Sequence, residues 1–336
     1  MLAAASCADG AAVPSKAPEP APRDGAPLEA AARPPLVVTR GTMGTRFQIA
    51  LVGDDDEALA RIARSCLDEV DRLECIFSSW APDTEVSRLT ADAAAGWRDA
   101  SPELAAALAA ALELSERTGG AFDVTVGPAL RAWGFYSGGR DAPPSAEELA
   151  SLAARVGAAK VRVRAAPPAV YRDAPGVELD FGALAKGFAI DAVVERLRAA
   201  GVENAFVNAG GSTVYALGDG PDGIGWPLEV ETAAGPRTWR LVDEAVSTSG
   251  RMGEGLRAGG ERLGHILDPR TLAPAATDVA RATFRGPSAT EADAASTALV
   301  ALGSEHARAW FERDAALAGR SALLVLESGR DVRLER

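Results

Sequence analysis

The chain has 336 residues, of which 47% are hydrophobic and 5% aromatic, and its formal net charge is −12. This length allows one large domain or two small ones, and the apolar fraction suffices for a sizeable core. The acidic balance excludes a general nucleic-acid partner, because binding to phosphates requires a basic face.

Residues 1–35 differ in composition from the rest of the chain, because proline and alanine dominate them. Such a segment cannot pack a core and is typical of a disordered tether. Ala4-Ala5-Ser6-Cys7 is similar to a bacterial lipoprotein cleavage box with Ala in place of Leu, although the charged and fully apolar regions of a signal are missing. We expect a truncated lipoprotein signal with a lipid anchor at Cys7; the alternative is a plain disordered tail.

The remaining cysteines do not predict a disulfide or a zinc site. Cys66 and Cys75 lie on one predicted helix and are too far apart along it to bridge each other. With His265 and His306 as the only histidines, the chain has too few soft ligands for zinc. No run of roughly 18 apolar residues is present, so no transmembrane span is expected.

Elements of both kinds are predicted along residues 36–336. Ser101 followed by Pro102, for example, is typical of a helix start, and Gly119-Gly120 of the stop that follows it. In chain order, the patterns predict a strand or hairpin over 36–52, helices over 55–77 and 101–117, a short helix capped by Ser145, strands over 160–164, 169–172 and 177–180, a helix over 183–200, strands over 204–217, 226–231, 238–248 and 278–285, helices over 288–302 and 304–314, and a closing strand over 321–326. Helices and short strands mix without a βαβ repeat, which favours an α+β fold.

The segment Leu179–Asp191 is glycine-rich and predicts a strand, a turn and a helix start. Free N–H groups at such a start can meet phosphate oxygens. Lys186 is one of only three lysines in the chain and can add a positive charge there, while Asp180 can accept from a ligand hydroxyl. The alternative is an Asp cap with an exposed Lys.

Asp293 and Thr297 are four residues apart on a predicted helix and therefore share one face. Both side chains offer hard oxygen atoms. Mg²⁺ prefers oxygen ligands and takes few from the protein, which leaves positions for substrate phosphates. The alternative is an exposed Asp and a Thr that bonds its own helix.

Two further segments contain candidate polar groups. Gly119-Gly120 leads into Ala121-Phe122-Asp123, a loop that either is a structural turn or packs against a planar ligand ring. His265 has Asp268 three residues later, and a histidine is the natural general base for a hydroxyl nucleophile. A lone histidine is more often structural.

Taken in order, these segments resemble the ApbE-type FAD:protein FMN transferases over roughly residues 39–302. The motifs that carry the resemblance are Gly41-Thr42-Met43-Gly44-Thr45, Ser78-Ser79-Trp80, Glu85–Leu89, Thr118–Asp123, Leu179–Asp191, Asn208-Ala209-Gly210-Gly211, Thr248-Ser249-Gly250, His265–Thr271 and Asp293–Thr297. The resemblance implies an ApbE-like, T-fold-like α+β architecture over residues 36–336, with mixed, largely antiparallel sheets and packed helices.

The resemblance also implies an activity, which is Mg²⁺-dependent transfer of FMN from FAD to a Ser or Thr hydroxyl of a target protein with release of AMP. It implies Mg²⁺ ligands at Ala183, through its backbone carbonyl, and at Asp293 and Thr297. It implies FAD contacts at Met43, Trp80, Ala121, Phe122, Asp123, Asp180, Lys186 and Ile266. His265, or an acid such as Asp268 beside it, would remove the proton of the target hydroxyl.

Family acceptors include subunits of ion-pumping redox complexes outside the cytoplasm. We therefore expect this chain on the extracytoplasmic face of a bacterial membrane, held there by a lipid at Cys7. Departures from the family pattern fall at Trp80, where Tyr is usual, and at Thr90, Ser212, Met252 and Leu272. The alternatives are a Mg²⁺-dependent FAD pyrophosphatase that yields FMN and AMP, and a non-catalytic FAD-binding lipoprotein.

Overall fold

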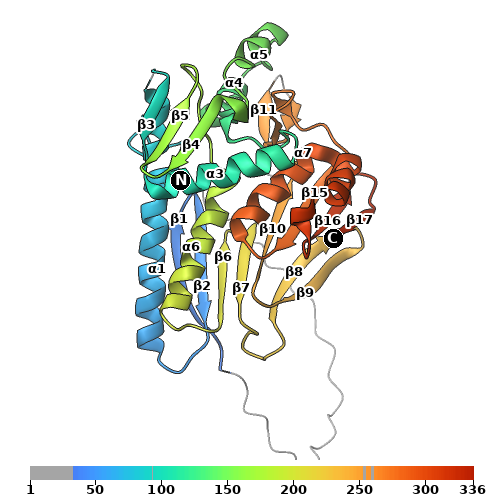
Figure 1. Ribbon diagram of the computed structural model, residues 1–336. Helices are drawn as coiled ribbons and strands as arrows, with labels where there is room; N and C mark the ends of the chain where they lie inside the picture. The colour runs from blue at the N-terminus through green and yellow to red at the C-terminus, as the bar shows by residue number, and fades with distance from the viewer. Residues whose placement is uncertain (1–32, 93, 253–254, 259–260) are drawn as a thin grey trace, which may run out of the picture. The chain divides into compact units, whose positions relative to one another are not determined.

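The computed structural model describes residues 33–336 apart from 93, 253–254 and 259–260 (Figure 1). Its centre is an eight-stranded sheet in which every neighbouring pair is antiparallel. The strands, in their order across the sheet, are β1 (Leu36–Thr42), β2 (Thr45–Leu51), β6 (Ala205–Ala209), β7 (Thr213–Leu217), β10 (Glu244–Gly250), β15 (Val279–Gly286), β16 (Ser321–Leu326) and β17 (Asp331–Glu335).

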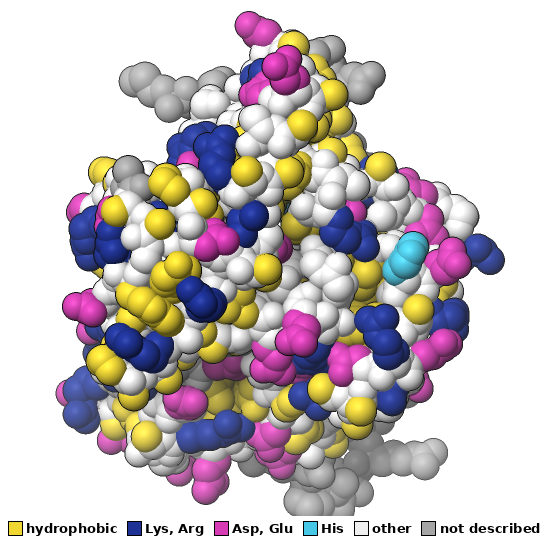
Figure 2. All heavy atoms as spheres, turned by 45° about the horizontal axis from the view of Figure 1, so that its top comes forward, with side chains coloured by type: hydrophobic (Ala, Val, Ile, Leu, Met, Phe, Trp, Pro, Cys, Tyr) yellow, Lys and Arg dark blue, Asp and Glu magenta, His cyan; other side chains and the backbone are white. Residues whose placement is uncertain are grey.

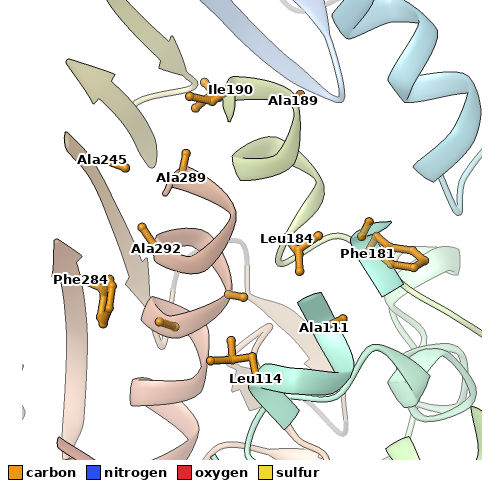
Figure 3. Packing of buried hydrophobic residues seen from close by; sticks show 14 of the residues in the cluster. Ala111, Leu114, Phe181, Leu184, Ala189, Ile190, Ala245, Phe284, Ala289 and Ala292 are labelled. Carbon is orange, nitrogen blue, oxygen red and sulfur yellow. The ribbon is translucent and has the colours of Figure 1, made fainter. Parts of the chain in front are cut away.

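Three long helices cover one face of this sheet: α1 (Asp56–Phe77), α6 (Ala185–Ala199) and α7 (Ala289–Arg313) (Figure 1). Small residues let α7 lie close to the strands, and Figure 3 shows Ala289 and Ala292 pointing towards the strands that carry Ala245 and Phe284. All four of these side chains are buried. The main core therefore lies between the sheet and this helical layer.

The hairpin of β8 (Trp226–Thr232) and β9 (Gly235–Leu241) packs against the opposite face of the sheet. Its Trp226 and Leu241 join a second core with Val214 and Val246. Every residue of β7 is buried, because this strand is covered on both faces.

A smaller sheet of β3 (Gly96–Asp99), β5 (Pro168–Arg172) and β4 (Val161–Ala165) packs against α3 (Pro102–Arg117). The other described elements are α2 (Glu85–Ala91), α4 (Gly127–Trp133), α5 (Ala146–Leu152), the hairpins β11 (Leu256–Ala258) with β12 (Glu261–Leu263) and β13 (Leu267–Asp268) with β14 (Ala273–Pro274), and the 3₁₀ turns η1 (Val124–Val126), η2 (Phe135–Ser137), η3 (Ala158–Lys160) and η4 (Ala315–Leu317). On the face in Figure 2, basic and acidic side chains are interspersed.

The predicted α+β class and largely antiparallel sheets are confirmed. The predicted break between two C-terminal helices is also present, because Gly303 has non-helical angles (φ 74°, ψ 168°) within α7. Asp278 accepts from the N–H of Ser304 at 2.9 Å and so caps the second part of that helix. Cys66 and Cys75 are both free thiols, as expected.

Several predicted boundaries were wrong for local reasons. Residues 177–180 form no strand, because the backbone there bonds to Val124 and to the guanidinium of Arg172 rather than to a neighbouring strand. The single strand predicted over 238–248 is divided by Asp243, whose φ of 50° turns the chain between β9 and β10. The chain closes with β17, one strand beyond the predicted end.

Residues 1–32, and with them the predicted lipid anchor at Cys7, lie outside the described residues, so that expectation stays a prediction. Within residues 33–336, no described helix has the length and apolar character needed to cross a membrane.

Candidate functional site

The candidate site is built where α6 and α7 cross at very close range. Gly187 on α6 makes this possible, because a Cβ at that position would lie 2.1 Å from the carbonyl oxygen of Ala289. The close approach brings the N–H of Gly187 to Oδ2 of Asp293, at 3.1 Å. The glycine that was predicted to permit close backbone approach is thus needed for helix packing.

Asp293 is buried and fully engaged. Only 4% of its surface is exposed, which rules out the alternative of an exposed acid. Its Oδ1 accepts from the hydroxyl of Thr213 at 3.0 Å and from that of Ser247 at 3.4 Å. Its Oδ2 faces Gly187 and lies 3.4 Å from Nζ of Lys186. A buried carboxylate of this kind requires compensating partners, and positive charge already approaches it on the Oδ2 side.

Ala183 lies in the turn before α6 rather than inside the helix, which begins two residues later than predicted. The first helical hydrogen bond runs from Phe188 N to Leu184 O, at 3.0 Å. The N–H of Gly187, which would otherwise bond to the carbonyl of Ala183, is taken by Asp293. Among the described residues no donor is assigned to that carbonyl, so its lone pairs are available to a ligand.

Thr297 lies one helical turn after Asp293. Its hydroxyl donates to the carbonyl of Asp293 at 3.3 Å and lies 3.1 Å from Oγ of Ser249. This bond to its own helix is the arrangement foreseen in the structural alternative. A hydroxyl that donates in this way still has lone pairs for a cation.

These residues fit a Mg²⁺ ion better than a softer metal. Asp293 supplies one carboxylate, Thr297 a hydroxyl and Ala183 a carbonyl, all of them hard oxygens. In the part of the chain that the structure describes, no group of three or more His, Cys, Asp or Glu side chains could hold a metal. Mg²⁺ typically binds one or two carboxylates together with substrate phosphates, and this set of donors agrees with that coordination preference.

Lys186 lies next to the Asp293 carboxylate and is partly exposed to solvent. Its ammonium group donates to the carbonyl of Gly182 at 3.3 Å, in addition to its ion pair with Asp293. The side chain is about one fifth exposed, at 22%. It is therefore held near the carboxylate while still reachable by a phosphate group.

Asp180 is fixed from two sides. Its Oδ1 accepts from the N–H of Gly182 at 2.9 Å, and its Oδ2 accepts a short hydrogen bond from the hydroxyl of Tyr136. Burial raises the pKa of the Tyr136 hydroxyl, and the neighbouring charge of Asp180 raises it further. Tyr136 therefore stays protonated and acts as a donor.

Trp80 lies beside this pair and is 71% exposed. Its ring meets that of Tyr136 edge to face, with centroids 5.2 Å apart. The guanidinium of Arg131 also contacts the Tyr136 ring and lies 5.0 Å from its centre. An exposed indole supported by a second ring offers a flat surface on which another planar ring can stack.

Met43 forms the tip of the β1–β2 hairpin. Met43 and Gly44 both have positive φ angles, 50° and 67°, which is the pattern of a two-residue type I′ turn. A non-glycine residue in this conformation is uncommon, which is consistent with a functional role for Met43. The half-buried Met43 side chain also packs against the main core.

The predicted segment Ala121-Phe122-Asp123 is buried, so its contacts to a ligand would come from the backbone. Burial raises the pKa of Asp123, whose Oδ1 accepts from Thr125 through N–H at 2.8 Å and hydroxyl at 2.7 Å. A pocket of about 650 Å³ opens next to it, lined by Gly119, Gly120, Gly157 and Arg270 among others. That volume lies within the usual range for small-molecule sites.

His265 and Asp268 lie in the segment between β12 and β14, and Asp268 is engaged by a neighbour. Arg270 donates to both carboxylate oxygens at 2.8 Å and to the carbonyl of Ala301 at 2.9 Å. His265 is half-buried, and Ile266 is buried with its carbonyl bonded to Ala275. Because Arg270 holds Asp268 as an ion pair, His265 is the better candidate for a general base.

A family model, described as the ApbE family, matches residues 43–320. The chain belongs to the ApbE family. The predicted family is thereby confirmed, and the match spans all the site residues listed above.

Two of the similar curated proteins share the name FAD:protein FMN transferase. A protein from Haemophilus influenzae named FAD:protein FMN transferase is 30% identical over 280 residues, which is 79% of this chain and 80% of the relative. A protein of the same name from Salmonella typhimurium is 26% identical over 318 residues, or 91% of this chain and 89% of the relative. Among solved structures, the apo form of the flavinyl transferase ApbE from Pseudomonas stutzeri matches with a TM-score of 0.78 and 30% identity, covering 89% of this chain and 93% of that one.

Several polar side chains at the site of this ApbE-family chain had no signal in the sequence. Thr213 and Ser247 contact Asp293, and Tyr136 contacts Asp180, although none of them was predicted there. Tyr136 lies in the 3₁₀ turn η2, which no sequence pattern predicted. In the sequence, Thr213 and Ser247 resemble any other strand residues. Only the pairing of their strands places both of them at Asp293.

Proposed function

We propose that this chain catalyses Mg²⁺-dependent transfer of FMN from FAD to a Ser or Thr hydroxyl of a target flavoprotein and releases AMP. The observation that carries the proposal is the buried carboxylate of Asp293, which accepts from the N–H of Gly187 and pairs with the ammonium of Lys186. Because that N–H is taken, the carbonyl of Ala183 has no helical donor among the described residues. The shared name of relatives that align over most of the chain supports it.

Ala183, Asp293 and Thr297 would hold the cation, which when bound supplies a positive charge against the pyrophosphate oxygens. Lys186 adds a second positive charge within reach of a phosphate. Positioned charges of this kind supply most of the acceleration in phosphoryl transfer.

The flavin half of FAD would be positioned by the exposed ring of Trp80, with Tyr136 supporting that ring and fixing Asp180. The remaining predicted contacts are Met43, the backbone of residues 121–123 and Ile266. The pocket beside Asp123 is large enough for part of a cofactor. The result is a fixed position for the FMN-side phosphorus.

In the reaction, the oxygen of the acceptor hydroxyl forms a bond to the FMN-side phosphorus. The bond from that phosphorus to the bridging oxygen breaks, and AMP leaves with the bridging oxygen. His265 takes the proton of the attacking hydroxyl, a role that typically contributes about 10²–10⁴-fold in rate. Arg270 pairs with Asp268 and holds its carboxylate in place.

We further propose that the acceptor is a flavoprotein such as a subunit of an ion-pumping redox complex. The enzyme would then work on the extracytoplasmic face of a bacterial membrane, anchored through a lipid on Cys7. A Cys7→Ser variant of the full precursor should move from the membrane fraction to the soluble fraction. If the variant stays in the membrane fraction, the lipid anchor at Cys7 is ruled out, and the proposed transferase activity is unaffected by that result.

One experiment tests the activity itself. The purified protein is incubated with FAD, Mg²⁺ and a flavin-acceptor domain from such a complex, and the products are separated on a denaturing gel under ultraviolet light. A fluorescent acceptor band that needs Mg²⁺ supports the transferase. Free FMN and AMP without a band would identify a pyrophosphatase instead, and unchanged FAD would leave only a flavin-binding protein.

A further inference from the structure

A continuous chain of hydroxyl groups joins the two predicted metal-binding side chains. It begins at Asp293 Oδ1 and ends at the Thr297 hydroxyl. Successive contacts run from Asp293 to Thr213 (3.0 Å), Thr213 to Ser247 (3.0 Å), Ser247 to Ser296 (3.3 Å), Ser296 to Ser249 (2.8 Å) and Ser249 to Thr297 (3.1 Å).

Strand pairing explains how this chain forms. Thr213 on β7 and Ser247 on β10 are direct cross-strand partners, so their side chains leave the sheet on the same face. That face is covered by α7, which carries Asp293, Ser296 and Thr297. Two residues further along β10, Ser249 lies on the same face of the sheet and meets the next turn of the helix.

The middle of the chain is fully enclosed. Thr213, Ser247 and Ser296 are each 0% exposed. A buried hydroxyl is costly unless it is hydrogen-bonded, and an apolar side chain of similar shape would fill the same space without that cost. Three such groups in one chain that reaches a buried carboxylate therefore call for a reason beyond packing.

We propose that Thr213 and Ser247 position the Asp293 carboxylate for cation binding and that Ser249 does the same for the Thr297 hydroxyl. The hydroxyl of Thr213 donates its single proton to Oδ1, and the hydroxyl of Ser247 lies within hydrogen-bond distance of both Oδ1 and the Thr213 oxygen, to one of which it donates. These contacts hold Oδ1 in place and leave Oδ2 directed at Gly187 and Lys186. Because Ser296 connects the two arms, both ligands are held as one unit. This inference rests on the proposed function only in taking Asp293 and Thr297 as ligands of the cation.

The test uses Mn²⁺ as the probe, with its binding to the full protein followed by electron paramagnetic resonance in the presence of FAD and no acceptor. Thr213→Val keeps the shape of the side chain and removes the hydroxyl. We expect its Mn²⁺ dissociation constant to rise about 10–100-fold, the usual effect of removing a group that orients a metal ligand. Thr213→Ser should restore binding close to the wild-type value, and Ser247→Ala should weaken it as Thr213→Val does.

Thr283→Val is the matched control. Thr283 is also a buried threonine, 1% exposed, but its hydroxyl bonds to Thr248 at 2.9 Å and not to the chain that reaches Asp293. This variant should lose thermal stability as Thr213→Val does, yet bind Mn²⁺ as the wild type does. FAD binding without metal, followed by flavin fluorescence, should be unchanged in every variant.

Equal Mn²⁺ affinity in Thr213→Val and wild type would overturn the inference and leave the hydroxyls with a packing role alone. Absence of Mn²⁺ binding to the wild type would overturn it as well. If the wild type binds Mn²⁺ and the variants lose it, but no flavin reaches an acceptor, the inference stands and the proposed transferase activity fails. The two claims are therefore separated by one set of proteins.

Discussion

The backbone N–H of Gly187 donates to Oδ2 of Asp293 at 3.1 Å, although the two residues are 106 positions apart in the sequence. This contact has two consequences. It ties the start of α6 to the first turns of α7, and it leaves the carbonyl of Ala183 without its usual helical donor. This one hydrogen bond therefore orients the carboxylate of Asp293 and leaves the carbonyl of Ala183 free of a helical bond, and both residues are predicted metal ligands.

Gly187→Ala should damage both packing and function. The added methyl would sit 2.1 Å from the carbonyl oxygen of Ala289, so the helices must separate. Overpacking of this kind typically costs about 1–3 kcal/mol of unfolding free energy. We expect that loss in urea denaturation together with weaker Mn²⁺ binding. Gly41→Ala is the control, because its nearest neighbour would be 4.0 Å away; equal stability of the two variants would contradict the packing account.

Asp293→Asn should abolish metal-dependent turnover while the protein stays folded. The amide has nearly the same shape but no charge for a cation, and it leaves Lys186 without its ion pair. The measurement is the initial rate of AMP release over a Mg²⁺ titration, with circular dichroism to show that the fold is intact. A wild-type rate in this variant would rule out Asp293 as a metal ligand.

Tyr136→Phe should weaken FAD binding more than it slows the chemical step. The change removes the hydrogen bond to Asp180 but keeps the ring against Trp80. A hydrogen bond to a charged group contributes about 1.5–3 kcal/mol, which corresponds to roughly 10–100-fold in affinity. We expect KM for FAD to rise by that factor with kcat within a few-fold of wild type.

The matched control is Tyr171→Phe, in which the affected ring belongs to an aromatic pair with Trp97 on the small sheet. Its KM for FAD should stay at the wild-type value. A large fall in kcat with unchanged KM in Tyr136→Phe would contradict a role in positioning the cofactor.

Glu69 should make the fold sensitive to acid. Arg72 donates to its carboxylate and lowers its pKa, and Arg196 on α6 contributes to the same effect. Since the pKa is lowered in the folded state, the stabilisation is complete above the unfolded value of about 4.3 and is lost as pH falls through the folded value.

Glu69→Gln should therefore lower the melting temperature at pH 7 and make it fall less steeply on acidification. The comparison is a set of thermal melts from pH 7 downwards, with Glu305→Gln, an exposed position, as the control. If Glu69→Gln and wild type lose the same stability between neutral and acid pH, the ion pair does not contribute to the acid response.

Local patterns predicted many of the helices and strands, because local chemistry specifies them. Caps such as Ser101 and breaks such as Gly303 act within one turn of the chain, and both stand where expected. The start of α6 was placed two residues early, since its first turn is decided by Asp293, far away in sequence. No local pattern contains that information.

The polar groups that were not predicted at the site also depend on contacts between distant parts of the chain. Thr213 and Ser247 lie in strands whose residues look like any others, and only the pairing of β7 with β10 beneath α7 sets them around Asp293. Tyr136 reaches Asp180 from a 3₁₀ turn, which has no hydrophobic period to reveal it. Asp268 looked like a candidate base by spacing, and its pairing with Arg270 appears only in three dimensions.

In the proposed reaction a protein hydroxyl, and not water, takes the FMN half of FAD. The most direct measurement is to run the reaction in ¹⁸O-labelled water with the acceptor domain and to record the masses of the acceptor, FMN and AMP. We predict an acceptor heavier by one FMN phosphoester, with no ¹⁸O in that group or in AMP, because water oxygen never enters the new bond. An unmodified acceptor together with FMN that carries one ¹⁸O would show that water, and not the acceptor hydroxyl, attacks the phosphorus.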